Sequence, residues 1–323
     1  MEQVRLGSTG LKVSRLCLGC MTFGTPKWRP WVLDEQASRP IIARALELGV
    51  TYVDTADMYS QGVGEAVVGR ALRDFARRDD VVIATKVFYA MSDRPNDQGL
   101  SRTHLMNSID RSLKALGTDY VDLYQIHAFD PETPIDETLQ ALDDIVRSGK
   151  VRYLGASAMA AWQFATMLHR AGERGWTKFV AMQNHYNLVH REEEREMIPL
   201  CRAEGIAVVP FSPLARGFLV GNRRKDSDGT TRARTDQYAR EYYYQDADFR
   251  VLDRVVALAD TKGVSPAQVA LAWVAGRPGV TAPIVGVSKI AQLEEAVKAL
   301  TISLADVERA SLEEHYVPRL PCG

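Results

Sequence analysis

The sequence predicts an α/β protein, a (β/α)8 or TIM barrel of eight parallel strand–helix units. From Ser14 onward, short apolar runs alternate with amphipathic helical stretches, and successive runs start roughly 30 residues apart, the length of a βα unit. Eight such units can be counted. The strands read as near-continuous apolar runs, which favours a closed barrel over an open sheet. The 323 residues fit one domain over 1–323.

Each unit contributes an expected strand and helix. A β-hairpin over 4–13, turning at Gly7-Ser8-Thr9-Gly10, comes first and is interpreted as a plug or flap. The expected strands are 15–18, 51–54, 81–86, 121–126, 151–155, 179–183, 207–211 and 282–285. The expected helices are 38–48, 64–75, 101–116, 135–148, 162–171, 192–203, 250–262 with 266–275, and 290–299. Ser101 as a cap, Gly117 as a stop and the Ser265-Pro266 start support these ends.

Three connections are too long for simple turns. They cover 87–100, 128–134 and 212–248, and all follow the carboxyl ends of strands. We therefore expect them to overhang one mouth of the barrel, where such proteins keep their chemistry. The last connection is rich in arginine and tyrosine, which suits either a phosphate clamp or an ordinary solvated loop.

Composition and charge exclude several classes of protein. Hydrophobic residues make up 46% and charged residues 25%, as in a globular enzyme, and a net charge of −1 gives no reason to expect nucleic acid or membrane partners. The charged first twenty residues show no secretory signal or membrane span, so the expected location is cytoplasmic. Cys17 and Cys20 have C-x-x-C spacing, but on a strand they point to opposite faces and cannot form a redox pair.

Four polar residues are expected at one end of the barrel. Asp54 ends the second strand, Tyr59 lies in the loop after it, Lys86 ends the third strand and His127 follows the fourth. Neighbouring strands would bring them together although they are far apart in sequence. A lysine ammonium beside a phenol lowers its pKa from about 10 toward that of a useful acid, and Asp54 would keep the lysine charged.

These residues resemble the motifs of the aldo-keto reductase superfamily, NADPH-dependent carbonyl reductases built on a TIM barrel. The motifs are Asp54-Thr55-Ala56 with Tyr59, the pair Thr85-Lys86, and Gln125-Ile126-His127. The resemblance covers nearly the whole chain. It points to bacterial members, in the broad group that also includes potassium-channel β subunits.

The resemblance also implies how NADPH is held. Ser157 and Gln183 would bind the nicotinamide carboxamide, and Phe211 would stack on the ring. The loop from Ser212 to Gly217 would cover the pyrophosphate, and the 286–289 segment with the following helix would bind a phosphate. The residues assigned to the cofactor are Asp54, Ser157, Gln183, Phe211, Ser212, Pro213, Leu214, Arg216, Arg234, Gly286, Ser288, Lys289, Gln292 and Glu295. Of these, Lys289 or Arg234 would bind the 2′-phosphate.

Other sites are disfavoured by the sequence. No G-x-G-x-x-G motif follows an expected strand, which argues against a Rossmann dehydrogenase. The strand ends carry no cluster of histidine and aspartate residues, so a metal-dependent barrel hydrolase is disfavoured. His185 follows Gln183 at the mouth, where a structural role is favoured over substrate contact.

The expected function is reversible reduction of an aldehyde or ketone to an alcohol, with Tyr59 as the general acid. The expected partner is a small carbonyl or alcohol molecule. Two alternatives stay open: a cofactor-binding regulatory or sensor protein of the same fold, and a lyase that uses Lys86 to form a Schiff base. The sequence leaves the natural substrate and the oligomeric state open.

Overall fold

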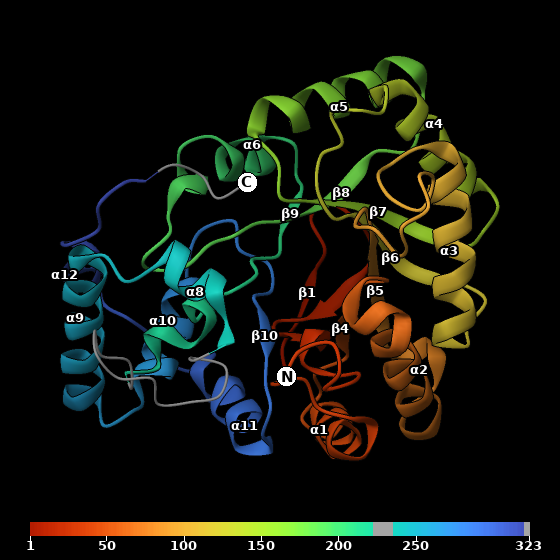
Figure 1. Cartoon of the computed structure of the whole chain (residues 1–323). Helices are drawn as coiled ribbons and strands as arrows, with labels where there is room; N and C mark the ends of the chain where they lie inside the picture. The colour runs from red at the N-terminus through yellow and green to blue at the C-terminus, as the bar shows by residue number, and fades with distance from the viewer. Residues whose placement is uncertain (222–234, 320–323) are drawn as a thin grey trace.

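The computed structural model describes residues 1–221 and 235–319 of the chain. Within these residues, eight parallel strands form one curled sheet in the order β10-β3-β4-β5-β6-β7-β8-β9 (Figure 1). The strands are β3 (Cys17–Gly19), β4 (Tyr52–Asp54), β5 (Val82–Val87), β6 (Val121–Ile126), β7 (Val151–Ser157), β8 (Phe179–Gln183), β9 (Ala207–Val208) and β10 (Ile284–Gly286). Val208 forms a parallel bridge with Val280, and Ile284 N donates to Pro210 O at 2.8 Å, which joins the two end strands. The expected (β/α)8 barrel is confirmed.

Proline shortens or shifts two of the expected strands. The strand expected over 207–211 forms a regular ladder only at Ala207–Val208, and the one expected over 282–285 runs from Ile284 to Gly286. Pro210 and Pro283 lack the N–H group that a continuous ladder needs. The other six strands differ from expectation by at most two residues at either end.

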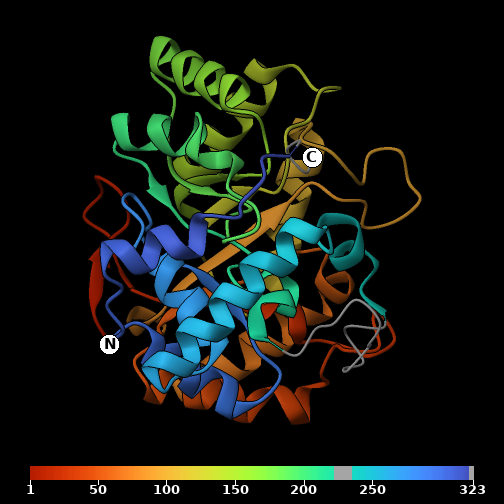
Figure 2. The same cartoon turned by 90° about the vertical axis from the view of Figure 1, so that its left-hand side faces the viewer.

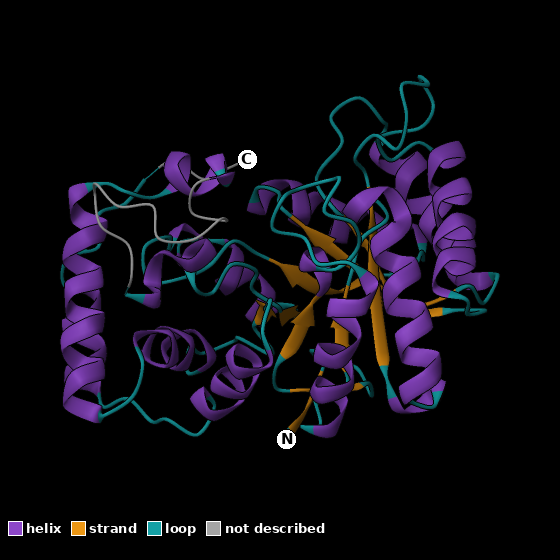
Figure 3. Ribbon diagram, turned by 60° about the horizontal axis from the view of Figure 1, so that its bottom comes forward, coloured by secondary structure: helices purple, strands orange, loops and turns teal. Residues whose placement is uncertain are grey.

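Helices form the outer layer around the strands (Figure 3). Those with expected counterparts are α1 (Glu35–Glu47), α2 (Val63–Phe75), α3 (Arg102–Leu116), α4 (Ile135–Arg147), α5 (Ala161–Arg174), α6 (Met197–Ala203), α9 (Asp246–Lys262), α10 (Pro266–Ala275) and α11 (Ile290–Ala299). Two further helices in the described part of the chain, α8 (Gln237–Tyr242) and α12 (Asp306–Glu313), have no expected counterpart. Helix α9 packs against α10 and α12, outside the end of the sheet that β10 forms (Figure 1).

Caps and prolines explain where several helices begin. Ser101 caps α3 through His104 N, and Ser265 caps α10 through Gln268 N, as expected. Helix α1 begins before Ser38 because the Asp34 carboxylate accepts from Ala37 N at 2.9 Å. The helix expected over 192–203 is instead a 3-10 turn, Glu192–Glu194, followed by α6. Pro199 lies in the first turn of α6, where a missing N–H breaks no intrahelical bond.

The N-terminal hairpin closes the barrel at the end opposite the long loop that follows β5 (Figure 2). It consists of β1 (Gln3–Arg5) and β2 (Lys12–Ser14). Leu6 and Val13 are fully buried and pack with inward-facing residues such as Tyr52 and Leu123. Ser8 N also donates to Gly205 O at 2.7 Å. The hairpin therefore acts as a plug and completes the interior core of the barrel.

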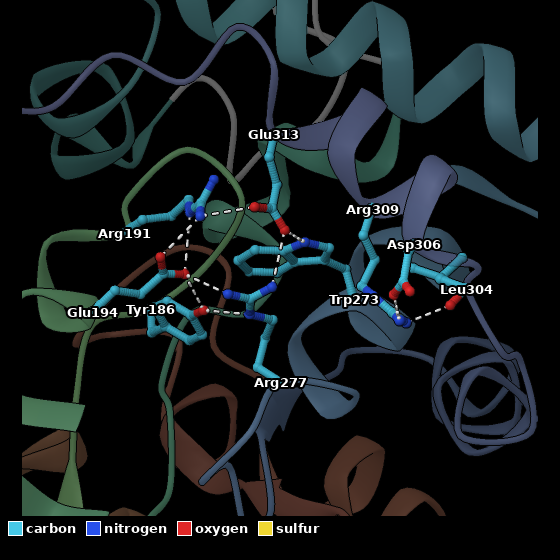
Figure 4. Close-up of polar contacts among 9 residues, drawn as sticks. All are labelled: Tyr186, Arg191, Glu194, Trp273, Arg277, Leu304, Asp306, Arg309 and Glu313. Atoms are coloured by element: carbon cyan, nitrogen blue, oxygen red, sulfur yellow. Dashed lines mark hydrogen bonds and ion pairs between the residues drawn. The ribbon is translucent and has the colours of Figure 1, made fainter. Parts of the chain in front are cut away.

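Polar side chains hold α12 against the barrel, and we call this group the C-terminal anchor (Figure 4). Its members are Tyr186, Arg191, Glu194, Trp273, Arg277 and Glu313. Glu313 of α12 accepts from Trp273 Nε1 at 2.8 Å and pairs with Arg277 at 3.0 Å and Arg191 at 2.9 Å. The anchor thus connects three segments that are distant in sequence.

Cys17 and Cys20 point to different parts of the core, as expected. Cys17 packs with the residues inside the barrel, whereas Cys20 packs in the layer between strands and helices. Both thiols are buried and free. Among the described residues, no helix is long and apolar enough to cross a membrane.

Candidate active site

A buried ion pair lies at the carboxyl end of the barrel. Asp54 ends β4 and Lys86 lies near the end of the adjacent β5, and the distance from Lys86 Nζ to Asp54 Oδ2 is 2.6 Å. The other carboxylate oxygen accepts from the amides of Gln125 at 2.9 Å and Gln183 at 3.0 Å. Asp54 is 2% exposed and Lys86 is fully buried. Such a pair is stable only with its remaining polar atoms satisfied, and the two amides provide this.

Lys86 keeps its charge in this environment. Burial lowers the pKa of its ammonium group, but the Asp54 carboxylate and the Tyr59 hydroxyl raise it more, so the net pKa lies above the ordinary value. Its Nζ also donates to the backbone oxygen of Thr55 at 2.9 Å. A permanently charged donor is therefore directed at the mouth of the barrel.

The hydroxyl of Tyr59 accepts a hydrogen bond from this charged group. Lys86 Nζ donates to Tyr59 Oη at 3.3 Å, and the ammonium lies 5.0 Å from the centre of the phenol ring. Within the described part of the chain, the hydroxyl donates its own proton to no protein acceptor. Asp54, Tyr59 and Lys86 converge as the sequence analysis expects, whereas their catalytic roles stay predictions.

The pKa of Tyr59 is raised, not lowered as expected from the neighbouring lysine. Lys86 does lower this pKa, but burial raises it by more and Asp54 raises it further, so the result lies above the ordinary value. The phenol is only 8% exposed because it packs beside the rings of Trp28 and His127, which come from other loops. Tyr59 is therefore fully protonated near neutral pH, the form that a proton donor needs.

His127 lies beside Tyr59 at the same mouth. Its ring is 5.9 Å from the phenol ring in an edge-on arrangement, and its backbone N–H donates to Val87 O at 3.0 Å. Burial, together with the charge of Lys86, lowers the pKa of the imidazole well below its ordinary value. The ring is therefore neutral, and its buried Nδ1 has no hydrogen-bond partner among the described residues. A neutral imidazole can donate a hydrogen bond to a carbonyl oxygen.

A left-handed turn positions Tyr59. The two residues after it, Ser60 and Gln61, have φ of 52° and 54°, a conformation that costs roughly 1–2 kcal/mol per non-glycine residue. Ser60 is buried, and its Oγ accepts from Thr25 N at 3.2 Å. Gly24 must be a glycine here, because it has a φ of 148° and a side-chain carbon would collide with Ser60. The turn thus ties the Tyr59 loop to the loop after β3.

The residues expected at the nicotinamide lie on adjacent strands. Ser157 pairs with Gln183 across β7 and β8, and Ser157 Oγ donates to Gln183 O at 3.0 Å. The Gln183 amide nitrogen is already directed inward to Asp54, so only its oxygen is left to accept a bond. Phe211 is half-buried and stacks on His185, with ring centres 5.1 Å apart.

The loop expected over the pyrophosphate has an unusual backbone. Ser212, Ala215 and Arg216 all have φ near 50°, and Gly217 has a φ of 89°. The Arg216 guanidinium makes two contacts of 2.8 Å to the Asp236 carboxylate. Its charge is therefore already paired, so Arg216 is less available to bind a phosphate than the sequence suggests. Pro213 and Leu214 lie in the same loop, and Arg234 lies outside the described residues.

The corner after β10 has the expected helix start. Gly286, Ser288, Lys289 and Gln292 are exposed, and Lys289 begins α11 without any side-chain cap on the helix. Ser288 N and Oγ both contact Gln292 Oε1, at 2.9 and 3.3 Å. Glu295 is half-buried on the following turn. An uncapped helix start with an adjacent lysine suits a phosphate group.

The sequence analysis assigns no role to Gln125 or Tyr243, and both contribute to the site. Gln125 lies inside β6 and holds Asp54, and its signal is a polar residue at an inward position of an apolar strand. His185 has the structural role that was favoured, because it stacks between Phe211 and His190 and contacts Tyr243 Oη at 2.6 Å. Tyr243 comes from the long 212–248 segment, whose path cannot be read from the sequence.

Among the described residues, no cluster of three or more histidine, cysteine or acidic side chains is placed to hold a metal ion.

Comparison with known proteins gives a consistent result. Residues 15–317 match the model of the aldo/keto reductase family. The chain is 45% identical to versiconal hemiacetal acetate reductase of Aspergillus parasiticus, with 99% of this chain and 98% of that protein covered. It is 40% identical to a putative aryl-alcohol dehydrogenase of Schizosaccharomyces pombe, covering 97% and 95%. A putative aryl-alcohol dehydrogenase of Saccharomyces cerevisiae is 36% identical, covering 99% and 98%.

These three relatives are fungal, so they do not support the bacterial origin that the resemblance suggested. Their identity and coverage, together with the family match over nearly the whole chain, agree with the barrel fold. The chain therefore belongs to the aldo/keto reductase family and is an oxidoreductase of carbonyl compounds and alcohols.

Proposed function

We propose that this protein reduces aldehydes or ketones reversibly to alcohols with NADPH, and that Tyr59 is the general acid. One observation carries the proposal. The Tyr59 hydroxyl accepts a hydrogen bond from a charged lysine and, among the described residues, commits its own proton to no protein acceptor. A phenol in this position has a proton available for a substrate oxygen.

Each residue of the site has a distinct role in this proposal. Tyr59 donates its proton to the carbonyl oxygen as that oxygen becomes an alkoxide. The nearby Lys86 charge stabilises the phenolate that is left, and Asp54 holds Lys86 in place. His127, as a neutral imidazole, orients the carbonyl oxygen. The reduced nicotinamide supplies the hydride when it is bound.

The chain offers suitable groups for the cofactor. Phe211 presents a half-exposed ring, and the oxygen of Gln183 together with the Ser157 hydroxyl is placed to read a carboxamide. The start of α11, where Lys289 makes no side-chain cap, offers backbone N–H groups to a phosphate. Asp54, Ser212, Pro213, Leu214, Arg216, Gly286, Ser288, Gln292 and Glu295 complete the proposed set.

A preference for NADPH over NADH follows from the exposed charge of Lys289, with Arg234 as the second candidate for the 2′-phosphate. Dissociation constants measured at low salt should be lower for NADPH. The double variant Lys289→Ala with Arg234→Ala should reduce this difference. Equal affinities in the wild type, or an unchanged preference in the double variant, would overturn the assignment.

The function itself is tested with a panel of carbonyl substrates, and turnover of each is measured as the loss of NADPH absorbance. The names of the two aryl-alcohol dehydrogenases favour including aromatic aldehydes. His127→Ala should lower kcat and raise KM, because the imidazole contacts the substrate oxygen before and during reaction. Tight NADPH binding without turnover of any aldehyde or ketone would favour the regulatory alternative.

A further inference from the structure

Arg29 lies in the loop between β3 and α1, surrounded by aromatic rings. Its Cζ is 4.6 Å from the ring centre of Trp28, 5.7 Å from that of Trp31 and 5.9 Å from that of Tyr238 on α8. The side chain is half-buried, so part of its hydration is already lost. A guanidinium that packs against aromatic rings in this way is attracted to their faces and is less hydrated than one in open solvent.

Among the residues that the structure describes, the guanidinium has no anionic partner. Throughout residues 1–221 and 235–319, it donates no hydrogen bond and forms no ion pair. Other arginines of the same region are paired: two nitrogens of Arg70 bind the two carboxylate oxygens of Glu35, and two nitrogens of Arg216 contact Oδ2 of Asp236. Arg29 therefore presents a planar set of N–H donors whose geometry matches a carboxylate and which no acceptor in the described part of the chain occupies.

The charge of Arg29 is close to the proposed acid. The Trp28 ring lies 6.2 Å from the Tyr59 ring, so the Arg29 guanidinium is no more than about 11 Å from the phenol ring. The hydrogen bond from Thr25 N to Ser60 Oγ fixes the two loops relative to each other. A substrate with its carbonyl at Tyr59 can therefore reach Arg29 with a group one aromatic ring away.

The surroundings of Tyr59 also suit a flat substrate. Trp28 is half-buried beside the phenol, and Tyr89 is 41% exposed with its ring 4.9 Å from that of His127. These partly exposed rings can pack on an aromatic substrate, since ring pairs are favourable beyond their buried area.

We propose that Arg29 is a specificity-determining residue that binds an anionic oxygen substituent, such as a carboxylate, on an aromatic aldehyde or ketone. The proposal rests on the proposed function and extends it to a substrate class. It requires that Arg29 contacts the substrate rather than merely packing the loop. A packing role would affect stability and all substrates equally.

The test compares para-carboxybenzaldehyde with its methyl ester, which keeps the ring and the aldehyde but removes the charge. Arg29→Gln should lower the ratio of kcat/KM for acid over ester by about tenfold or more, because a charge-assisted bidentate contact is lost. Arg29→Lys should give an intermediate ratio. Lys27→Gln, which removes an exposed positive charge two residues away, should leave the ratio unchanged. The wild-type ratio should also fall as salt is added.

Other outcomes contradict the proposal. An unchanged ratio in Arg29→Gln, or equal losses for acid and ester, would mean that Arg29 only packs the loop. A raised NADPH dissociation constant with an unchanged ratio would place Arg29 at the cofactor instead. If the wild type reduced neither these two compounds nor any other member of the carbonyl panel, the proposed function would fail. Calorimetric binding of the two compounds to wild type and Arg29→Gln would still decide the role of Arg29 in that case.

Discussion

The active site and the C-terminal anchor both combine a tyrosine, a cation and a carboxylate. In the anchor, Tyr186 Oη donates to Glu194 Oε1 at 2.5 Å and accepts from Arg277 Nε at 3.2 Å. In the active site, Tyr59 accepts from Lys86, and the carboxylate of Asp54 bonds to Lys86 rather than to the phenol. The same residue types are thus connected in a different order.

This order determines what each tyrosine can do. Burial and the Glu194 carboxylate raise the pKa of Tyr186, and its proton is held by that carboxylate. The proton of Tyr59 is held by no acceptor in the described part of the protein, and the neighbouring charge favours its departure. Proton availability, rather than residue composition, therefore distinguishes the proposed acid from a structural tyrosine.

The largest expected effect tests this difference directly. Tyr59→Phe should lower carbonyl reduction by about a hundred- to ten-thousandfold, the usual contribution of a general acid, while NADPH binding stays nearly intact. Tyr186→Phe, the matched change in the anchor, should keep wild-type turnover. The measurement is kcat/KM with a substrate that shows a deuteride isotope effect. Wild-type turnover by Tyr59→Phe, or an equal loss in both variants, would remove the distinction.

The next effect concerns the two cations. Lys86→Met should reduce turnover through the same proton as Tyr59, so the double variant should lose little more than the worse single one. Arg277→Met in the anchor should leave turnover unchanged and lower stability. Circular dichroism must show that Lys86→Met is folded, because Asp54 is then buried without its cation. Additive losses in the double variant would indicate that Lys86 and Tyr59 act independently.

A third prediction concerns the carboxyl groups behind Lys86. Burial raises the pKa of Glu65 to about 7 and that of Asp57 to about 6, and their partners are the hydroxyls of Thr85 at 2.6 Å and Ser108 at 2.6 Å. Both raised values lie above those of the unfolded chain. The folded state therefore binds more protons, and stability should fall as pH rises from about 4 through about 7.

Urea unfolding at several pH values checks this prediction. Glu65→Gln should remove the Glu65 share of the fall, on the order of a few kcal/mol, and leave the Asp57 share. A Glu65→Gln protein with the same pH dependence as the wild type would show that Glu65 is charged in the folded state. Glu65 would then be a further anion close to Lys86, which would weaken the contrast between the two regions.

The smallest expected effect lies in the anchor. Glu313→Gln should cost about 1–3 kcal/mol of unfolding free energy, because Arg191 and Arg277 lose a charged acceptor, and turnover should not change. The adjacent Glu314→Gln is a matched control. Its ion pair with Arg254 is exposed, so the loss should be within about 1 kcal/mol. Thermal or urea unfolding of both variants measures the difference, and equal losses would indicate that the anchor is no stronger than a surface ion pair.

Much of the barrel and the core of the site could be predicted from the sequence. Strand periodicity and barrel topology are enough to place Asp54 and Lys86 side by side, because adjacent parallel strands have a fixed spacing. Local signals also located most helix ends, such as the Ser101 cap. These features depend on short-range chemistry that the sequence states directly.

The parts that could not be predicted depend on loop paths. Arg216 pairs with Asp236 in a loop where Ser212, Ala215 and Arg216 adopt left-handed backbone conformations. Such conformations are uncommon for residues other than glycine, so the sequence does not predict them. The raised pKa of Tyr59 arises from packing with Trp28, which is contributed by a different loop. Long-range side-chain packing decides both, and the sequence pattern carries no information on it.

The burial of the cysteines affects how readily electrophiles can alkylate the protein. Cys17, Cys20 and Cys201 are buried, and burial raises the pKa of each thiol, to about 12 for Cys201. Thiolates are the form that electrophiles alkylate, and carbonyl compounds conjugated to a double bond are such electrophiles. These three positions should therefore resist iodoacetamide until the protein unfolds. An enzyme built this way can work on reactive carbonyl compounds without being inactivated through these residues by the molecules that it consumes.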